Sequence, residues 1–334
     1  MASREEYLAR LDLQTLRGLE IGPADRPWIP ATVRGIRYAD HLSTEDLRKG
    51  WAADSHYKAE DLCEISFVLD ERPLRETLGE WVDLDVIAAS HVVEHVPNLL
   101  NWLRELASAL KPDGLLFLVA PNKRFEFDRL RRVTELADVL TTFLDKRTQP
   151  SLAAMLDCWL HFAKHDGNTT WWDEVDTRAM TVMHTIPYVY DQAKAAVERG
   201  GYTDVHVSVF TPYSFIRLIH DLTLLELMPL ELIDIDAVGI EIFLMFRACP
   251  VNEDVPRRLK KLDEMEVRFP FNVEDYYSGL LLHGERLPDN VDELPGGSVR
   301  AELERVKAEL ERMKSSASWK VTAPLRSVRS RLPK

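Results

Sequence analysis

Cysteine is scarce in this sequence, with three residues in 334. They stand far apart and form no Cys-x-x-Cys pair, which argues against a disulfide framework and against a zinc knuckle. Such cysteine usage is typical of a reducing compartment, so we expect a cytoplasmic protein. The three residues are Cys63, Cys158 and Cys249.

Basic charge and long apolar runs are also in short supply. The 42 Lys and Arg face 55 Asp and Glu, a net charge of −13. The body of the chain is therefore a poor candidate for sequence-independent nucleic-acid binding, and we expect no nucleic-acid partner. No stretch approaches the ~20 apolar residues of a membrane-spanning helix. The opening MASREEYLARLDL contains acids and no apolar centre, which is not the pattern of a secretory signal.

What the sequence does contain is a repeated alternation of strand and helix patterns. Residues 97–110 form an amphipathic pattern that Lys111-Pro112-Asp113-Gly114 ends by turn chemistry, and a second helix is expected over 3–12. Apolar strands separated by helices predict a parallel α/β sheet. The expected strands in this part are 16–22, 33–42, 65–70, a stretch inside 83–96, and 115–121.

The pattern changes after Asn122. Residues 123–200 look helical and aromatic, with no clear strand, and we interpret them as an acceptor-binding insertion. Further on we expect a strand over 203–211, a helix over 212–227 and a last strand over 239–248. The predicted domains are a core of 1–122 and 201–249, the insertion, an irregular extension and linker over 250–297, a short coiled-coil-like helix over 298–316, and a basic amphipathic tail over 317–334.

The loop that follows the first strand, LEIGPADRPWIP, is a poor site for a dinucleotide. Gly22 permits a close approach to the main chain, but Pro23 has no N–H to offer a phosphate. Glu20 and Asp25 would repel a pyrophosphate. A cofactor with a cationic end suits this loop better, and S-adenosylmethionine has an ammonium, a sulfonium and no phosphate. Glu20 would then attract the ammonium, directly or through water.

Two further acids stand where a parallel sheet places its ligands. Asp40 ends the second strand, in position to accept hydrogen bonds from both ribose hydroxyls, and Asp70 ends the third, in position to accept from the adenine amino group. GLEIGP, Asp40 and DLDVIAASHVVEHVPNLLNWLRELASALKPDGLLFLVAP together resemble the class I S-adenosylmethionine-dependent methyltransferases over roughly residues 15–125.

The resemblance implies a Rossmann-like seven-stranded sheet, a helical insertion after the fifth strand, and a closing hairpin near 203–248. Its usual loop is ExGxGxG, and this chain has Ala24 and Arg26 at the two later glycine positions. The cofactor-binding residues that it implies are Glu20, Gly22, Pro23, Asp40, His41, Asp70 and Ser90.

The segment HVVEH after the fourth strand offers three readings. His91 or His95 could remove the acceptor's proton, because the pKa of histidine lies near working pH. Glu94 and His95 could instead only cap the next helix. The third reading is a divalent ion held by His91, Glu94, His95 and His206. It rests on a similarity to the Glu-x-x-Glu-His motif of some O-methyltransferases, and such an ion would lower the pKa of a hydroxyl.

The insertion is rich in aromatic residues, which stack against sugar rings. Trp171 and Trp172 are adjacent, so at least one should lie at a surface or in a pocket. We therefore expect an O-methyltransferase that acts on a sugar hydroxyl of a surface glycan or of its nucleotide-sugar precursor. The alternatives are a methyltransferase for a small quinone-type metabolite and a non-catalytic scaffold of a polysaccharide assembly complex.

The end of the chain points to partners. SASWKVTAPLR resembles a C-terminal segment of bacterial enzymes of surface-polysaccharide assembly. The tail has basic and apolar residues and no acid, which suits an anionic membrane surface, although a solvated tail fits as well. The stripe over 298–316 predicts a coiled-coil partner or a homodimer.

Overall fold

A computed structural model describes residues 16–51, 61–272 and 275. The chain divides into two compact units, 1–280 and 281–334, and all described residues belong to the first. The helix expected over 3–12, the coiled-coil-like helix over 298–316 and the basic tail over 317–334 therefore lie outside the described residues. None of the helices in the described ranges has the length and apolar character of a membrane-spanning segment.

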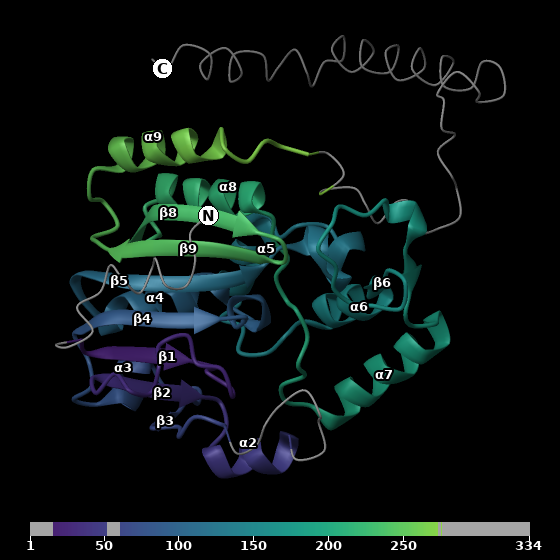
Figure 1. Cartoon of the computed structure of the whole chain (residues 1–334), viewed down its shortest axis with the longest axis horizontal. Helices are drawn as coiled ribbons and strands as arrows, with labels where there is room; N and C mark the ends of the chain where they lie inside the picture. Colours follow the sequence, from purple (N-terminus) through teal and green to yellow (C-terminus); the bar gives the residue numbers. More distant parts are fainter. Residues whose placement is uncertain (1–15, 52–60, 273–274, 276–334) are drawn as a thin grey trace, which may run out of the picture. The chain divides into compact units, whose positions relative to one another are not determined.

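The centre of the first unit is a seven-stranded sheet in the order β3-β2-β1-β4-β5-β9-β8 (Figure 1). Strands β1 to β5 are parallel, and β9 runs antiparallel to both of its neighbours. This arrangement confirms the predicted Rossmann-like seven-stranded sheet. The strands are β1 Gly18–Ile21, β2 Ile36–Asp40, β3 Phe67–Val68, β4 Leu84–Ser90, β5 Leu110–Pro121, β8 Leu230–Val238 and β9 Glu241–Ala248.

Strand alternation explains how the sheet is buried on both faces. Ile87 and Leu116 belong to a core cluster that also includes residues of the helices α3 (Leu74–Leu78), α4 (Leu99–Ala109), α8 (Pro212–Leu224) and α9 (Val255–Glu266). Val86 and Phe117, one residue away on the same strands, belong to the second cluster, where Trp28 of the β1–β2 connection covers the opposite face. Such two-sided burial is typical of a parallel strand with a continuous apolar sequence.

The longer helices include α4, which the sequence predicts well. It begins after Asn98, whose side chain accepts a hydrogen bond from the N–H of Asn101, and it ends one residue before the predicted boundary. Residues 111–114 then bulge within β5, where Asp113 has a φ of 62°. The helices are α2 Thr44–Trp51, α3 Leu74–Leu78, α4 Leu99–Ala109, α5 Leu136–Leu144, α6 Leu152–Leu160, α7 Ile186–Arg199, α8 Pro212–Leu224 and α9 Val255–Glu266.

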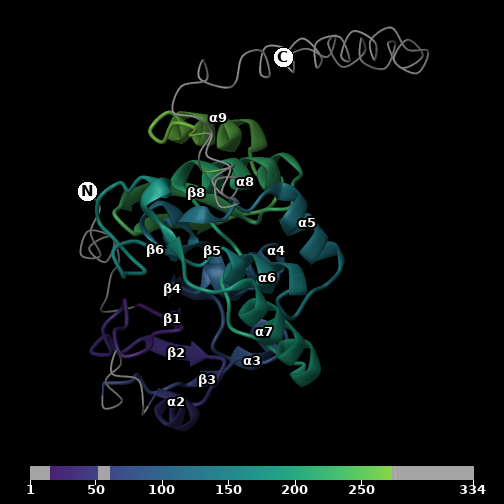
Figure 2. The same ribbon diagram turned by 90° about the vertical axis from the view of Figure 1, so that its right-hand side faces the viewer.

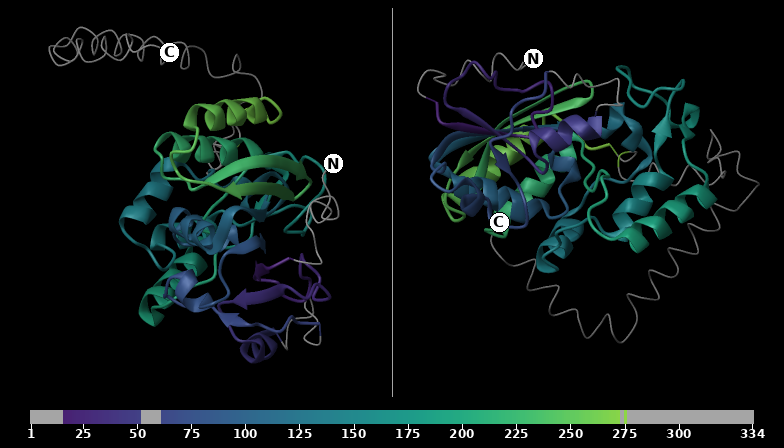
Figure 3. Two further views of the ribbon diagram at one scale, coloured as in Figure 1. Left: turned by 90° about the vertical axis from the view of Figure 1, so that its left-hand side faces the viewer. Right: turned by 90° about the horizontal axis from the view of Figure 1, so that it is seen from below.

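The segment between β5 and α8 lies at the carboxyl-terminal ends of the parallel strands. Figures 1 and 2 show α6, α7 and β6 beyond this edge of the sheet, and the view from below in Figure 3 agrees. The segment contains helices, as predicted, and also a small hairpin. Its short elements are η2 Lys123–Phe125, η3 Phe127–Leu130, β6 Ala163–Lys164, η4 Thr177–Ala179 and β7 Thr181–Val182. A further short helix, η1 Val93–His95, lies between β4 and α4.

The predicted strand over 203–211 is wrong. This stretch is extended but joins no sheet, because its main chain bonds to turns instead. The N–H groups of Val207 and Ser208 both donate to the carbonyl of Glu94, at 2.7 and 3.0 Å, and that of Val209 donates to Thr134. The partner of β9 in the closing hairpin is β8.

The prediction of an irregular stretch after Pro250 is also wrong in part. Helix α9 begins there, with Asp254 accepting a hydrogen bond from the N–H of Arg257 and a proline in the first turn. Its Leu262 and Met265 pack into the core cluster that contains α8, so tertiary burial stabilises a highly charged helix.

Candidate active site

The register of the sheet brings the predicted cofactor-binding residues to one edge. Ile21 pairs with Ala39 on one side and with Ala89 on the other. Gly22, Asp40 and Ser90, the next residue of each chain segment, are therefore level at the carboxyl ends of β1, β2 and β4. A ligand of an open α/β sheet binds at this place.

The loop after β1 depends on a glycine. Gly22 has a φ of 66°, and a Cβ there would lie 2.7 Å from Cγ2 of Val92. Ala24 also has a positive φ, of 49°, which is uncommon for a residue other than glycine. The later glycines of the usual loop are thus absent, yet the loop still takes a left-handed conformation after Pro23.

The Glu20 side chain stabilises this loop through hydrogen bonds to its main chain. Its side chain is buried, and its two carboxylate oxygens accept hydrogen bonds from the N–H groups of Trp28, at 2.5 Å, and Ile29, at 2.8 Å. The predicted contact of Glu20 with a cofactor ammonium has to compete with these bonds. Glu20 therefore has a structural role as well, because it stabilises the β1–β2 connection.

Asp40 and Asp70 differ in their surroundings. Asp40 is buried, with Oδ1 at 2.7 Å from Nδ1 of His41, and this hydrogen bond raises the pKa of His41. Asp70 is exposed and accepts hydrogen bonds from Arg72, which lowers the pKa of the carboxyl group. It lies two residues beyond Val68, the last residue of β3.

The acceptor groups at this edge of the sheet suit a cationic cofactor. A buried carboxylate, a loop whose Gly22 is only half-buried, and a second acid beyond β3 are suited to a ribose, an ammonium and an adenine. No Lys or Arg occurs from Leu19 to Asp25, so this stretch of the loop offers no cation to a phosphate.

His91 lies between two acids. Its φ is 54°, its Nδ1 is 3.5 Å from Oε1 of Glu94, and its Nε2 is 3.7 Å from Oε1 of Glu241. Burial alone would lower the pKa of His91, but Glu241 and Glu94 outweigh burial and raise it to about 9. A base must be deprotonated, so these two ion pairs oppose the predicted role of His91.

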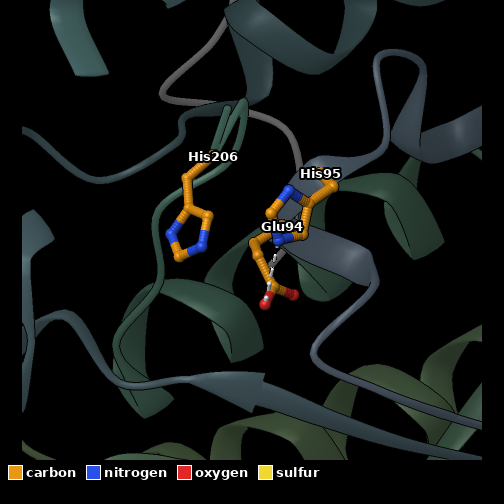
Figure 4. Close-up of side chains that lie close together, drawn as sticks. All are labelled: Glu94, His95 and His206. Atoms are coloured by element: carbon orange, nitrogen blue, oxygen red, sulfur yellow. Dashed lines mark ion pairs between the residues drawn. The ribbon is translucent and has the colours of Figure 1, made fainter. Parts of the chain in front are cut away.

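Glu94 and His95 follow on η1 (Figure 4). The Glu94 carboxylate is buried, and His95 reaches it with Nε2 at 3.8 Å from Oε1. Burial would raise the pKa of Glu94, but His91, His206 and His95 together lower it. Nδ1 of His95 lies 2.8 Å from Oδ1 of Asp204, and Asp204 raises the pKa of His95 against the opposing effect of burial.

His206 comes close to Glu94 because the extended segment is bonded to the Glu94 carbonyl. Its Nδ1 lies 2.5 Å from Oδ2 of Asp128. Arg131 donates to the other oxygen of Asp128 at 2.8 Å. Although burial opposes it, Arg131 and His206 hold the pKa of Asp128 well below its usual range. Burial and then Asp128 raise the pKa of the neighbouring Glu126 well above its ordinary value.

The structure thus brings together Glu94, His95 and His206, and His91 also approaches Oε1 of Glu94. Sequence reasoning missed Asp128 and Asp204 as the partners of the two histidines. Asp204 stands two residues before His206, and Asp128 stands in the charged run EFDRLRR, but neither signal shows which side chains are buried.

The adjacent tryptophans divide as expected. Trp171 is buried and donates from its ring N–H to the carbonyl of Arg124 at 2.9 Å, whereas Trp172 is 72% exposed. The ring of Trp172 lies against Gly239 in the β8–β9 turn, since a Cβ on that glycine would be 2.8 Å from the ring. Trp172 therefore lies at the same edge of the sheet as the start of β9.

Comparison with known proteins indicates the class of this domain. Residues 2–158 match the model of a family described as "Methyltransferase domain". This part of the chain is therefore similar to a methyltransferase domain. The sheet order and the carboxylates at its edge suit S-adenosylmethionine as the methyl donor.

Solved structures similar to this domain share little sequence with it. One is the trans-methyltransferase CalH in complex with SAH, 17% identical, with 73% of this chain and 54% of that chain covered and a TM-score of 0.33. A SAM-dependent methyltransferase from Aquifex aeolicus is 12% identical, with 73% and 88% covered and a TM-score of 0.34.

A third structure, an O-methyltransferase family protein from Burkholderia thailandensis, is 13% identical, with 73% and 55% covered and a TM-score of 0.35. The chain spans about half the length of CalH. No curated protein matches the sequence.

Proposed function

We propose that this chain is an O-methyltransferase whose acceptor is a sugar hydroxyl, carried by a surface glycan or by its nucleotide-sugar precursor. S-adenosylmethionine supplies an electrophilic methyl group bound to sulfur. The observation that carries the proposal is the position of a histidine–carboxylate cluster and an exposed tryptophan at the same edge of the sheet. A hydroxyl needs a proton acceptor, and a sugar ring needs an apolar face.

The residues of β1, β2 and β4 would hold the cofactor. Asp40 would accept hydrogen bonds from the ribose hydroxyls, and Gly22 would let the cofactor approach the main chain. Ser90 and His41 would line the same edge, and Asp70 would accept from the adenine amino group. Alignment of acceptor and donor contributes much of the rate of such an in-line displacement.

A histidine would take the proton of the acceptor. His95 is held by Asp204 through Nδ1, so its Nε2 would be the accepting atom. His91 is the alternative, and it would first have to give up its proton to serve. A histidine with a nearby carboxylate keeps one ring nitrogen oriented for transfer.

Trp172 would provide the stacking face for the sugar. Its indole ring packs against Gly239 in the β8–β9 turn, and most of the side chain is exposed. Two exposed tyrosines of α7, Tyr188 and Tyr190, lie on the same insertion. Aromatic faces pack against the C–H faces of sugars while neighbouring polar groups bond to the hydroxyls.

The test is transfer of labelled methyl groups from S-adenosylmethionine. The full chain is given free sugars, UDP-sugars and a dihydroxybenzoate, the last as a quinone-type precursor. Label on a sugar supports the proposal, and label only on the dihydroxybenzoate supports the small-metabolite alternative. A protein that binds no S-adenosylmethionine and labels nothing would be the scaffold.

Trp172→Ala adds a matched test of the acceptor site. We expect a KM for the sugar at least tenfold higher, because stacking contributes roughly 1–3 kcal/mol per aromatic contact, with unchanged affinity for S-adenosylmethionine. Phe271→Ala, which removes an exposed aromatic side chain outside the insertion, is the control. Equal KM values for both variants would remove Trp172 from the acceptor site.

For the end of the chain we propose contact of the tail 317–334 with an anionic membrane surface and pairing of the stripe 298–316 with a partner helix or a second copy. Flotation with vesicles that contain anionic lipid tests the first, and a chain that ends at 316 is the control. Sedimentation of the full chain tests the second.

A further inference from the structure

Three potential metal ligands converge at the carboxyl end of β4. Glu94 and His95 come from η1, and His206 comes from the extended segment before α8, as Figure 4 shows. One ligand atom of each residue lies within 4.8 Å of the others. The rings of His95 and His206 meet edge to face, with their centroids 4.7 Å apart.

Each histidine of the group is held by an acid on its outer side. Nδ1 of His206 lies 2.5 Å from Asp128, and Nδ1 of His95 lies 2.8 Å from Asp204. A carboxylate on one ring nitrogen fixes the ring and leaves Nε2 as the ligand atom, which is the usual arrangement behind metal-binding histidines. The hydrogen bond to Asp128 orients His206 as a ligand, whereas His95 is paired with Asp204 by distance and charge alone.

The backbone holds the group together. The carbonyl of Glu94 accepts hydrogen bonds from both Val207 and Ser208, the residues that follow His206. These two hydrogen bonds to one carbonyl fix the position of the extended segment relative to η1. The ligand positions therefore come from main-chain geometry, which a change of one side chain would leave in place.

The Glu94 carboxylate also points to a bound cation. The residue is 1% exposed, and neither oxygen has a hydrogen-bond partner among the described residues; His91 and His95 approach Oε1 only to 3.5 and 3.8 Å. A buried carboxylate without hydrogen bonds is costly. A cation placed between Glu94 and the two histidines would satisfy it.

We propose that Glu94, His95 and His206 bind a divalent first-row cation such as Zn²⁺. Two imidazole nitrogens and one carboxylate oxygen form a ligand set that suits Zn²⁺ or Fe²⁺ better than Mg²⁺, and three protein ligands leave a coordination position open. If the proposed function holds, the open position takes the acceptor hydroxyl and lowers its pKa. In that case Nε2 of His95 binds the ion and does not serve as the base, so His91 is the histidine left to accept the proton.

A neighbouring set, Glu126, Asp128 and His206, has the same spacing but is less suited to a cation. Asp128 is already bonded to Arg131 through one oxygen and to His206 through the other. A cation there would have to displace an arginine from a buried pair. Asp128 is better described as the support of His206.

The experiment measures metal directly. The full chain, purified without a polyhistidine tag, is stripped with a chelator, dialysed against Zn²⁺ or Co²⁺ and analysed for metal content. We expect about one ion per chain, and for Co²⁺ the visible absorption of a site with nitrogen and oxygen ligands. Metal content equal to that of a buffer blank at micromolar free Zn²⁺ would overturn the proposal.

Glu94→Gln and His206→Ala identify the site. Each should weaken Zn²⁺ binding at least tenfold, whereas His220→Ala should not. His220 of α8 is a suitable control because it also lies near two acids, Asp221 and Asp263. If Zn²⁺ binds equally well to wild type and Glu94→Gln, the proposal is wrong. If His206→Ala does not fold, the Zn²⁺ affinity of Glu94→Gln alone decides the test.

S-adenosylmethionine binding, measured on the same samples, separates the two proposals. Metal that binds to a chain without affinity for the cofactor would leave the metal site standing and reject the proposed function. Cofactor binding and methyl transfer by a chain that takes up no metal would reject the metal site and leave the proposed function standing.

Discussion

Replacement of Gly22 by alanine tests the geometry of the cofactor loop. The substitution adds one methyl group at a residue with a φ of 66°, and that methyl would lie 2.7 Å from Cγ2 of Val92. The left-handed conformation costs an alanine roughly 1–2 kcal/mol. The overlap adds about 1–2 kcal/mol, since Val92 is half-buried and can shift only in part.

We therefore expect Gly22→Ala to lose about 2–4 kcal/mol of unfolding free energy, measured by urea unfolding with an unchanged slope. Affinity for S-adenosylmethionine should fall as well, because the loop has to move. The assay is a urea titration of the full chain followed by circular dichroism, with calorimetry for the cofactor.

Two further variants separate the causes. Gly167 has a φ of 80° and no atom within 4 Å of an added Cβ, so Gly167→Ala should show the backbone cost alone. Gly22→Ala combined with Val92→Ala should be less destabilising than the sum of the two single changes, because the overlap is gone. An unfolding free energy of Gly22→Ala within ~0.5 kcal/mol of wild type, or an equal loss in Gly22→Ala and Gly167→Ala, would contradict this prediction.

Two predictions concern pH and buried charge. The Glu231 side chain is buried, and despite burial Arg257 and Arg247 lower its pKa to about 2. Glu231→Gln should therefore lower the free energy of unfolding by about 2 kcal/mol at pH 7. The difference in unfolding free energy between wild type and variant should shrink as the pH falls from 4.5 to 2. A difference that does not depend on pH would contradict this prediction. Burial lowers the pKa of Lys123 to about 7, so the unfolded chain binds more protons above that pH. Wild type should gain stability relative to Lys123→Met between pH 7 and 10 in urea unfolding, and parallel pH profiles would refute it.

The sheet was predictable because its parallel strands carry continuous apolar sequences. Strand β5 and helix α4 follow directly from the spacing of their leucines. The alternation in 203–211 predicts extended backbone correctly, but it cannot tell a sheet partner from the carbonyl of Glu94, which lies more than a hundred residues earlier. Strand β8 alternates in LELIDID and could have been found from the same signal.

The candidate site was predictable in its local parts only. The spacing of His91, Glu94 and His95 reveals a polar turn after a buried strand. Asp128 and His206 are 78 residues apart, and nothing in the sequence says that they touch. The same holds for Glu20, whose bonds to the loop backbone depend on the path of the chain after Pro23.

The central claim is that the edge formed by β1, β2 and β4 binds S-adenosylmethionine through Asp40. Equilibrium binding of labelled S-adenosylmethionine to the full chain and to Asp40→Asn tests it most directly. We predict one molecule bound per wild-type chain and an affinity at least tenfold weaker in Asp40→Asn, because a buried ribose contact to a carboxylate contributes roughly 1.5–3 kcal/mol. No saturable binding to the wild type, or equal affinity of the two proteins, would contradict the account.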